Sequence, residues 1–222
     1  RMITLRDVSF RFAAGGFHLQ IPALDIDAKS HVAFAGPSGS GKTTILNLVA
    51  GILVPSSGEV LVKDCVVSAL SDQQRRAFRL RNIGFVFQNF DLINYLSVKN
   101  NILVAARIDP TLSVTDALRS RAQNLAVRMG IGDKLDSYPG MLSQGEQQRV
   151  AIARALLLQP QIILADEATG NLDPDNKQAV MDLLIAEARM AGATLVAVTH
   201  DHELLERFDR VLDFRDLLVA RC

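Results

Sequence analysis

The chain has few cysteines and no excess charge of either sign. Its 222 residues include two cysteines, Cys65 and Cys222, whose spacing fits neither a disulfide framework nor a metal-ligand motif. This usage favours a reducing compartment. Lys plus Arg number 24, and so do Asp plus Glu. The balance gives no reason to expect nucleic acid or an anionic membrane surface as a partner.

The sequence also lacks a long apolar run, an internal repeat and a low-complexity tract. Its longest apolar runs, residues 161–165 and 194–199, are far shorter than the roughly 20 residues that a helix needs to cross a bilayer. The first residues lead directly into an expected strand, without the pattern of a secretory signal. The length suits one large domain with room for an insert. We therefore expect a soluble, cytoplasmic chain.

Apolar patterning in the first part of the chain predicts two kinds of strand. Residues 3–12 and 17–26 alternate in part between apolar and polar side chains, as in half-buried antiparallel strands. Residues 31–35 form a short apolar run that leads into a glycine-rich loop. Residues 44–51 then continue with helical spacing and stop at a glycine.

Further along, short apolar strands alternate with helices, which is the pattern of a parallel sheet covered by helices on both faces. Residues 89–144 change to a helical period, with Ser97 and Thr115 as expected N-caps, and indicate an inserted helical subdomain. The remaining expected strands are 59–63, 83–87, 162–165 and 194–198, the expected helices are 72–81, 145–158 and 175–190, and residues 210–214 and 217–220 are expected to form a small hairpin.

The glycine-rich loop has the chemistry of a phosphate site. Its glycines allow successive N–H groups to turn inward and form a nest for an anion, and the dipole of the following helix adds positive charge. Lys42 would reach the outer phosphates of a nucleotide, and the Thr43 hydroxyl would ligate Mg²⁺. A chance glycine-rich turn is the alternative, which the strand–loop–helix context disfavours. The predicted phosphate-binding residues are Gly36, Pro37, Ser38, Gly39, Ser40, Gly41, Lys42, Thr43 and Thr44.

Two carboxylates follow the apolar strand at residues 162–165, at the end where parallel sheets bind ligands. We expect Asp166 to accept a hydrogen bond from Mg²⁺-bound water and Glu167 to polarise the attacking water. An acidic strand cap is the alternative. The phosphate-binding loop upstream favours the catalytic role.

Two further polar residues follow buried strands. His200 comes after the strand at 194–198, and we expect it to contact the γ-phosphate and the attacking water rather than to be only a hydrogen-bonded loop residue. Gln88 ends the strand at 83–87, where its amide would reach Mg²⁺ or the attacking water. A simple polar strand terminus fits the position of Gln88 equally well.

A polar run near the end of the helical insert, taken alone, is only a turn before a helix. Taken with the residues above, it resembles the signature of the ATP-binding cassette (ABC) family of ATPases, and the resemblance covers essentially the whole chain. Phe12 stands where that family places an aromatic ring that stacks on adenine. The matching motifs, in the family's order, are the P-loop at 36–43, Gln88, Leu142-Ser143-Gln144-Gly145-Glu146-Gln147-Gln148-Arg149, Asp166-Glu167, Asn171-Leu172-Asp173 and His200.

The resemblance implies a single nucleotide-binding domain of the α/β class. Residues 1–88 and 146–222 would form the P-loop NTPase core, with a mostly parallel sheet and an N-terminal antiparallel β subdomain, and about 89–145 the helical subdomain. It also implies that two cassettes pack head to tail around two ATP molecules with Mg²⁺. Each ATP would lie between the P-loop of one subunit and the signature of the other. The residues expected to contact nucleotide in this way are Ser143, Gln144, Gly145, Glu146 and Asp173.

Within the family, residues 85–88, 149–156 and 165–173 are similar to the lipoprotein-release, macrolide-efflux and cell-division cassettes. Two positions depart from the family pattern. Gln144 replaces a usual glycine, so its side chain crowds the turn while its backbone N–H remains, and we expect reduced rather than abolished function. Ala168 replaces a usual proline, which removes a rigid φ without removing a chemical group.

Since the chain has no membrane span, work on a membrane would need a separate membrane subunit. We expect that subunit to dock on the segment from Phe90 to Ile102, whose apolar side chains follow Gln88. Packing inside the helical insert is the alternative for part of them. The expected function is an ATPase, peripheral on the inner face of the cell membrane, that drives export or extraction. An ATP switch that transmits force to an envelope partner is the alternative, and a soluble cassette acting on nucleic acid is disfavoured by the neutral charge.

Overall fold

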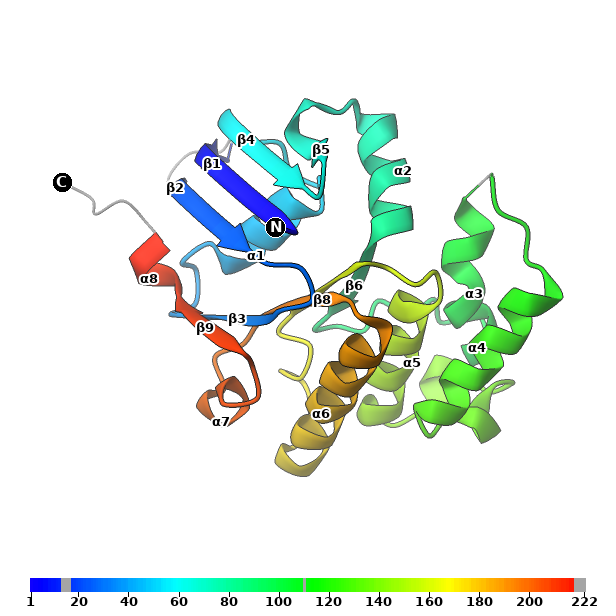
Figure 1. Ribbon diagram of the computed structural model, residues 1–222. Coiled ribbons are helices and arrows are strands. Elements are labelled where there is room, and N and C mark those ends of the chain that lie inside the picture. The colour runs from blue at the N-terminus through cyan, green and yellow to red at the C-terminus, as the bar shows by residue number, and fades with distance from the viewer. Residues whose placement is uncertain (13–16, 110, 218–222) are drawn as a thin grey trace.

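The computed structural model describes residues 1–12, 17–109 and 111–217. It contains a four-stranded sheet in the order β2-β1-β4-β5 and a five-stranded sheet in the order β6-β7-β8-β3-β9. The first is antiparallel and the second is parallel at every pairing of its described strands. The predicted α/β class, with a parallel core sheet and an N-terminal antiparallel subdomain, is confirmed (Figure 1).

The described residues form the following strands and α-helices. The strands are β1 (Ile3–Arg11), β2 (His18–Ile26), β3 (His31–Ala35), β4 (Ser57–Val62), β5 (Cys65–Val66), β6 (Ile83–Phe87), β7 (Ile162–Asp166), β8 (Thr194–Val198) and β9 (Arg210–Asp213). The α-helices are α1 (Lys42–Val49), α2 (Asp72–Asn82), α3 (Val98–Ile108), α4 (Asp116–Arg128), α5 (Gln144–Leu156), α6 (Pro174–Ala191), α7 (His202–Leu205) and α8 (Phe214–Leu217).

The parallel sheet lies between two hydrophobic cores because its side chains alternate between its faces. In β3, Val32 and Phe34 join the core formed with α1 and the antiparallel sheet, whereas Ala33 joins the core formed with α5 and α6. Helix α1 therefore lies between the two sheets (Figure 1). Both faces of the sheet are covered, which explains why its strands read as continuous apolar runs.

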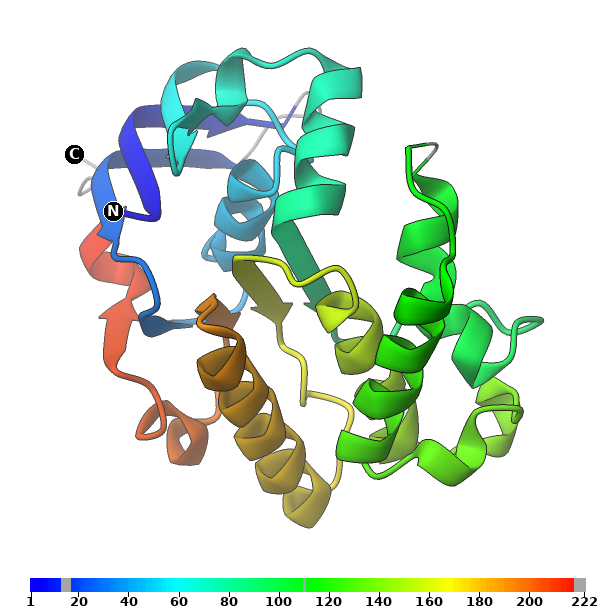
Figure 2. The ribbon, with the colours of Figure 1, turned by 45° about the vertical axis from the view of Figure 1, so that its right-hand side comes forward.

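The helical insert packs beside α5, away from the antiparallel sheet (Figure 2). Helix α3 begins at the N-cap Ser97, whose side chain accepts from Asn100 N, and α4 at the N-cap Thr115, whose side chain accepts from Leu118 N. Both caps were predicted from the sequence. Among the described helices, none has both the length and the apolar character that a bilayer crossing requires.

The expected hairpin at the tail is wrong. Residues Arg210–Asp213 instead form β9, which pairs parallel to β3 at the edge of the sheet. The side chain of Asp213 then accepts from Arg215 N at 2.9 Å and starts the turn of α8. Phe214 is fully buried with its ring edge-on to Phe34, at 6.2 Å between centroids, so burial of this ring turns the chain inward. The part of the expected hairpin at 218–220 lies outside the described residues.

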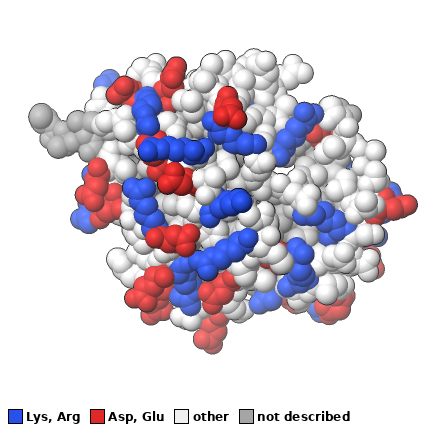
Figure 3. All heavy atoms as spheres, viewed as in Figure 1, with Lys and Arg blue, Asp and Glu red and all other residues white. Residues whose placement is uncertain are grey.

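Strand β5 and helix α7 were not predicted, and the other differences concern boundaries. Strand β4 begins at Ser57, two residues earlier than expected, and α1 begins at Lys42, inside the predicted phosphate loop. On the face seen in Figure 3, Lys and Arg side chains are interspersed with Asp and Glu, in keeping with the zero net charge. That nucleic acid is not a partner stays a prediction.

Candidate active site

The predicted polar residues gather at one edge of the parallel sheet. The register places Asp166 at the end of β7 beside Phe87 of β6 and Val198 of β8. The loops that carry Gln88, Glu167 and His200 therefore leave the sheet at its carboxyl edge, beside the loop that follows β3. This is the edge where open parallel sheets bind ligands.

The loop after β3 has backbone geometry that only glycine accepts readily. Gly39 and Gly41 have φ values of 74° and 108°, in the region that a Cβ disfavours. At Gly41 a Cβ would also lie 2.6 Å from the ring of Phe17. Gly41 is the N-cap of α1 and offers no side-chain cap, so the first N–H groups of α1 are free for an anion.

Lys42 lies folded into this loop. Its side chain is 5% exposed, and Nζ donates to Gly36 O at 2.9 Å, Pro37 O at 2.6 Å and Ser40 Oγ at 3.3 Å. Burial lowers the pKa of Lys42, and the carboxylates of Glu167 and Asp166 oppose this shift. The ammonium thus stands in the anion nest, bonded to carbonyl oxygens that phosphate oxygens would replace.

Thr43 and Asp166 meet across the loop. Thr43 Oγ1 donates to Asp166 Oδ1 at 3.0 Å. Burial raises the pKa of Asp166, whereas the hydrogen bond from Thr43 lowers it. These hard oxygen donors suit Mg²⁺, which keeps several water ligands and takes few from protein. Within the described residues, no group of three or more His, Cys, Asp and Glu could hold a metal alone, so phosphate oxygens and water would complete the shell.

Glu167 and His200 form the second polar pair of the site. His200 Nδ1 lies 3.5 Å from Glu167 Oε1. Glu167 has a φ of 45°, and its backbone N–H donates to Val198 O at 3.0 Å. A left-handed conformation in a residue with a Cβ costs free energy and often marks a functional site. The loop thereby presents this carboxylate to the pocket that Lys42 also lines.

The side chain of Gln88 contacts the loop that follows Glu167. Its Nε2 donates to Asn171 Oδ1 at 3.2 Å, and Asn171 Nδ2 donates back to Gln88 O at 3.0 Å. A Cβ at Gly170 would lie 2.8 Å from the same Nε2. The amide is therefore held by the loop between Glu167 and α6, and its predicted contact with Mg²⁺ or water stays a prediction.

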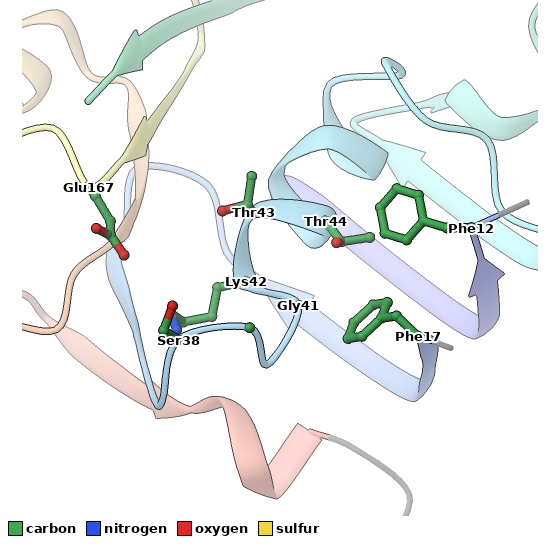
Figure 4. Close-up of a pocket in the computed structure, with 9 residues that line it drawn as sticks. Phe12, Phe17, Ser38, Gly41, Lys42, Thr43, Thr44 and Glu167 are labelled. Atoms are coloured by element: carbon green, nitrogen blue, oxygen red, sulfur yellow. The ribbon is translucent and has the colours of Figure 1, made fainter. Parts of the chain in front are cut away.

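The pocket itself has an aromatic end and a polar end. It encloses about 250 Å³, with Phe12 and Phe17 at one end and Glu167 at the other (Figure 4). The two ring centroids are 6.0 Å apart. Phe12 was predicted and Phe17 was missed, although an aromatic residue at the start of the second strand was visible in the sequence. Ser38, Gly39, Gly41, Lys42, Thr43 and Thr44 complete the lining.

The signature residues form the start of α5, apart from this pocket lining. Ser143 is the N-cap, its Oγ accepts from Glu146 N at 3.2 Å, and Glu146 Oε2 accepts from Ser143 N at 2.8 Å. This capping box leaves the hydroxyl hydrogen of Ser143 free to donate. Ser143 and Gln144 are exposed, while Gly145 is buried.

Asp173 lies next to the signature within the same chain. It is the N-cap of α6, where its oxygens accept from Asn176 N at 3.1 Å and Asn176 Nδ2 at 2.7 Å. The hydrogen bonds from Asn176 lower the pKa of Asp173. A Cβ at Gly145 would lie 3.1 Å from Asn176 Oδ1. Ala168 is buried in the core against α5 and α6, and no contact there requires a proline.

A pocket over a phosphate loop, with an acidic pair at the end of a nearby strand, is the arrangement of a P-loop ATPase. The profile described as ABC transporter matches residues 19–170. The chain belongs to the ABC transporter family, and it is an ABC ATPase that binds and hydrolyses ATP.

Relatives and solved structures agree with the predicted branch. The chain is 42% identical over 202 residues to the macrolide export ATP-binding/permease protein MacB of Rhodopirellula baltica, covering 89% of this chain and 29% of MacB. It is 38% identical to the lipoprotein-releasing system ATP-binding protein LolD of Syntrophus aciditrophicus, over 100% of both chains. The dimeric cassette MJ0796, in a post-hydrolysis state bound to ADP and Pi, superposes with a TM-score of 0.87 at 33% identity, covering 99% of this chain and 97% of that one.

Proposed function

We propose that this chain closes head to tail on a second copy of itself around two ATP molecules and drives a separate membrane protein in export or extraction. The observation that carries the proposal is the separation within one chain of the P-loop pocket from the exposed signature residues Ser143 and Gln144. A second copy related by a two-fold axis would bring each signature to the other's pocket. One solved structure of similar fold, the cassette MJ0796, is dimeric and bound to ADP and Pi.

In this scheme the pocket orients ATP along its length. Adenine lies against Phe12 and Phe17, and the phosphates lie in the loop from Gly36 to Thr44. Lys42 exchanges its carbonyl partners for phosphate oxygens, so little new desolvation is needed on binding. Mg²⁺, when bound, neutralises charge on the β- and γ-phosphates. Thr43 and Gln88 would hold it, with Asp166 accepting from one of its waters.

Glu167 acts as the general base for hydrolysis. Its carboxylate accepts a proton from the attacking water, whose oxygen forms the new bond to the γ-phosphorus as the bond to the leaving oxygen of ADP breaks. His200, 3.5 Å from Glu167, orients this carboxylate and contacts the γ-phosphate. The products are ADP and inorganic phosphate.

The partner's signature completes the site from the opposite side. The free hydroxyl hydrogen of Ser143, the N–H of Gln144 and the dipole of α5 all face the γ-phosphate in the closed dimer. Glu146 keeps Ser143 in the capping geometry, and Asp173 lies in the same interface. Loss of the γ-phosphate on hydrolysis removes these contacts, so the dimer opens.

The surface for a membrane subunit lies beside this site. A groove of about 260 Å³ between α2, β6, α3 and α5 is lined mainly by apolar side chains, among them Phe85, Val104, Ile108 and Leu158. Asp91, from the predicted segment between Phe90 and Ile102, is part of this lining. Tyr95 in that segment is 81% exposed, whereas Phe90 is buried in the insert. Part of the segment therefore packs the insert and part is open to a partner, and this position would place the cassette on the inner face of the membrane.

Glu167→Gln tests the dimer. The variant should bind ATP normally, lose turnover by at least about a hundredfold because the base is gone, and form an ATP-dependent dimer in light scattering. Glu206→Gln, which changes an exposed carboxylate away from the pocket, should leave turnover unchanged and form no trapped dimer. A Glu167→Gln chain that stays monomeric at saturating ATP would overturn the proposal.

Photo-cross-linking from position 95 in native membranes tests the docking surface. Failure to capture any membrane protein would contradict the proposed docking surface.

A further inference from the structure

Two consecutive residues just after Gln88 have left-handed backbone. Phe90 has a φ of 64° and Asp91 a φ of 48°. A residue with a Cβ adopts this region at a cost in free energy, and a large buried ring such as Phe90 does so rarely. The conformation therefore needs a group that holds it. None of the residues expected to contact the nucleotide supplies that group.

Arg154 of α5 supplies it. Its Nη1 donates to Asp91 O at 2.5 Å and its Nη2 donates to Phe90 O at 2.8 Å. Burial lowers the pKa of Arg154, and the nearby Asp91 carboxylate opposes this shift. Because a guanidinium stays charged in proteins, both contacts are charge-assisted hydrogen bonds. The planar fork of Arg fixes the two carbonyls in one relative orientation.

A second side chain of α5 holds the segment on the other side of Gln88. Gln148 is fully buried, and its Nε2 donates to Phe87 O at 3.4 Å. The carbonyls that flank Gln88 are thus bonded to the helix that begins with the signature. Gln88 in turn bonds Asn171, and Gly170 N donates to Glu167 O at 2.8 Å. A continuous set of contacts runs from α5 to the loop of the general base.

We propose that Arg154 is a positioning residue for ATP hydrolysis. By fixing the left-handed backbone of Phe90 and Asp91, it keeps Gln88 beside the loop of Glu167 and makes Gln88 move as one body with α5. Without Arg154 the segment relaxes to right-handed or extended backbone, and Gln88 shifts relative to Asn171. The nucleotide pocket, which Arg154 does not line, keeps its shape.

The test uses the full chain and compares Arg154→Ala with Arg154→Ala/Asp91→Gly. Arg154→Ala should lower kcat for ATP about tenfold, the worth of one charge-assisted hydrogen bond, and leave KM within about twofold. Adding Asp91→Gly should restore most of kcat, because glycine adopts positive φ without a Cβ penalty. Arg154→Lys should fall between Arg154→Ala and the unchanged chain, since an ammonium reaches the carbonyls without the planar fork.

Arg149→Ala is the matched control. Arg149 lies on the same helix and donates to a single carbonyl, Met129 O, at 3.0 Å in the helical insert. Any loss that this change causes should not be recovered by Asp91→Gly. Thermal melting followed by circular dichroism shows which variants are folded. If Arg154→Ala does not fold, Arg154→Lys with and without Asp91→Gly provides the same comparison.

Four results would overturn the proposal. One is an Arg154 variant with unchanged kcat. Another is a folded Arg154 variant whose kcat Asp91→Gly fails to raise, which would make Arg154 only a structural residue. The third is a rise in KM at constant kcat, which would place its effect on ATP binding. A parallel gain in the Arg149→Ala background would likewise show that the glycine acts generally and not through the contact with Arg154.

Discussion

At the scale of single residues, the aromatic end of the pocket depends on two rings held in different ways. Phe10 packs edge-on against Phe12, with centroids 4.9 Å apart, and leaves Phe12 44% exposed at the mouth of the pocket. Phe17 instead lies over Gly41, so close that a Cβ there would be 2.6 Å from the ring. Phe12 therefore has a free face for adenine, while Phe17 also keeps the phosphate loop in shape.

This difference predicts the effect of removing the Phe12 ring. Phe12→Ala should raise KM for ATP several-fold, because a base–aromatic stack is worth about 1–3 kcal/mol, with little change in kcat. Phe12→Tyr should behave as the unchanged chain, since stacking needs only the ring face. Steady-state ATPase kinetics check both variants. A fall in kcat at constant KM in Phe12→Ala would contradict a role in binding adenine.

Much of the site at this scale could be predicted from the sequence, and some could not. The contact of Thr43 with Asp166 could be predicted, because Thr43 belongs to the phosphate-loop motif and Asp166 to the acidic pair at the end of β7. The bond from Gln88 to Asn171 joins residues 83 positions apart. The direction in which the Gln88 side chain points depends on how two loops pack against each other, and no local sequence pattern encodes that packing. The place of Phe17 over Gly41 depends in the same way on the pairing of β1 with β2.

At the scale of elements, two helices begin with the same device. In α2 the side chain of Ser71 accepts from Gln74 N while Gln74 accepts from Ser71 N, and in α5 Ser143 and Glu146 do the same. Only the second cap belongs to the proposed interface with ATP. A comparison of the two caps therefore distinguishes the contribution of a cap to helix stability from its contribution to catalysis.

Ser143→Ala and Ser71→Ala should lower the free energy of unfolding by similar amounts, about 1 kcal/mol each. Only Ser143→Ala should also lower ATPase activity, because it removes a donor to the γ-phosphate of the partner's ATP. Urea unfolding and ATPase assays on both variants make the comparison. Equal loss of activity in the two variants would mean that Ser143 acts only through helix stability.

The success of the sequence-based prediction also differs between elements. Strands β3, β6 and β8 were predicted at their observed bounds, because each is a buried apolar run between polar or glycine residues. Strand β9 was predicted as part of a hairpin because its own sequence does not show that it pairs with β3. That pairing depends on contacts nearly the length of the chain apart. Burial of Phe214 against Phe34 then excludes the hairpin.

At the scale of the whole molecule, one buried histidine links stability to pH. His31 is 1% exposed between β3 and the neighbouring elements, and its Nδ1 has no hydrogen-bond partner among the described residues. Burial lowers the pKa of His31 below 6.5, with Arg189 lowering it further and Asp209 and the Ala193 carbonyl opposing. The unfolded chain therefore binds this proton at a higher pH than the folded chain does.

The stability that neutral His31 contributes is complete above the unfolded pKa and is lost as pH falls below it, by up to about 1.4 kcal/mol for each unit of pH. Urea unfolding at roughly pH 7.5 and 5.5 should show this loss in the unchanged chain. His31→Gln should show a smaller loss. Equal pH dependence in the two chains would show that other groups titrate in this range.

In the proposed dimer, each active site is built from two chains. A chain with Lys42→Ala loses its own phosphate loop, and a chain with Ser143→Arg loses the signature that it offers to its partner. Mixed together, they form dimers in which one site carries both changes and the other carries neither. If each active site were built within a single chain, every site in such a mixture would carry one of the two changes, and none would be intact.

The most direct test measures ATPase activity of the two variants alone and mixed in equal amounts. Each alone should be inactive, and the mixture should regain roughly a quarter of the wild-type rate, because random pairing leaves about that fraction of sites intact. A chain carrying both changes should rescue neither variant. A mixture as inactive as its components, under conditions where Glu167→Gln chains form the ATP-bound dimer, would contradict a site shared between two chains.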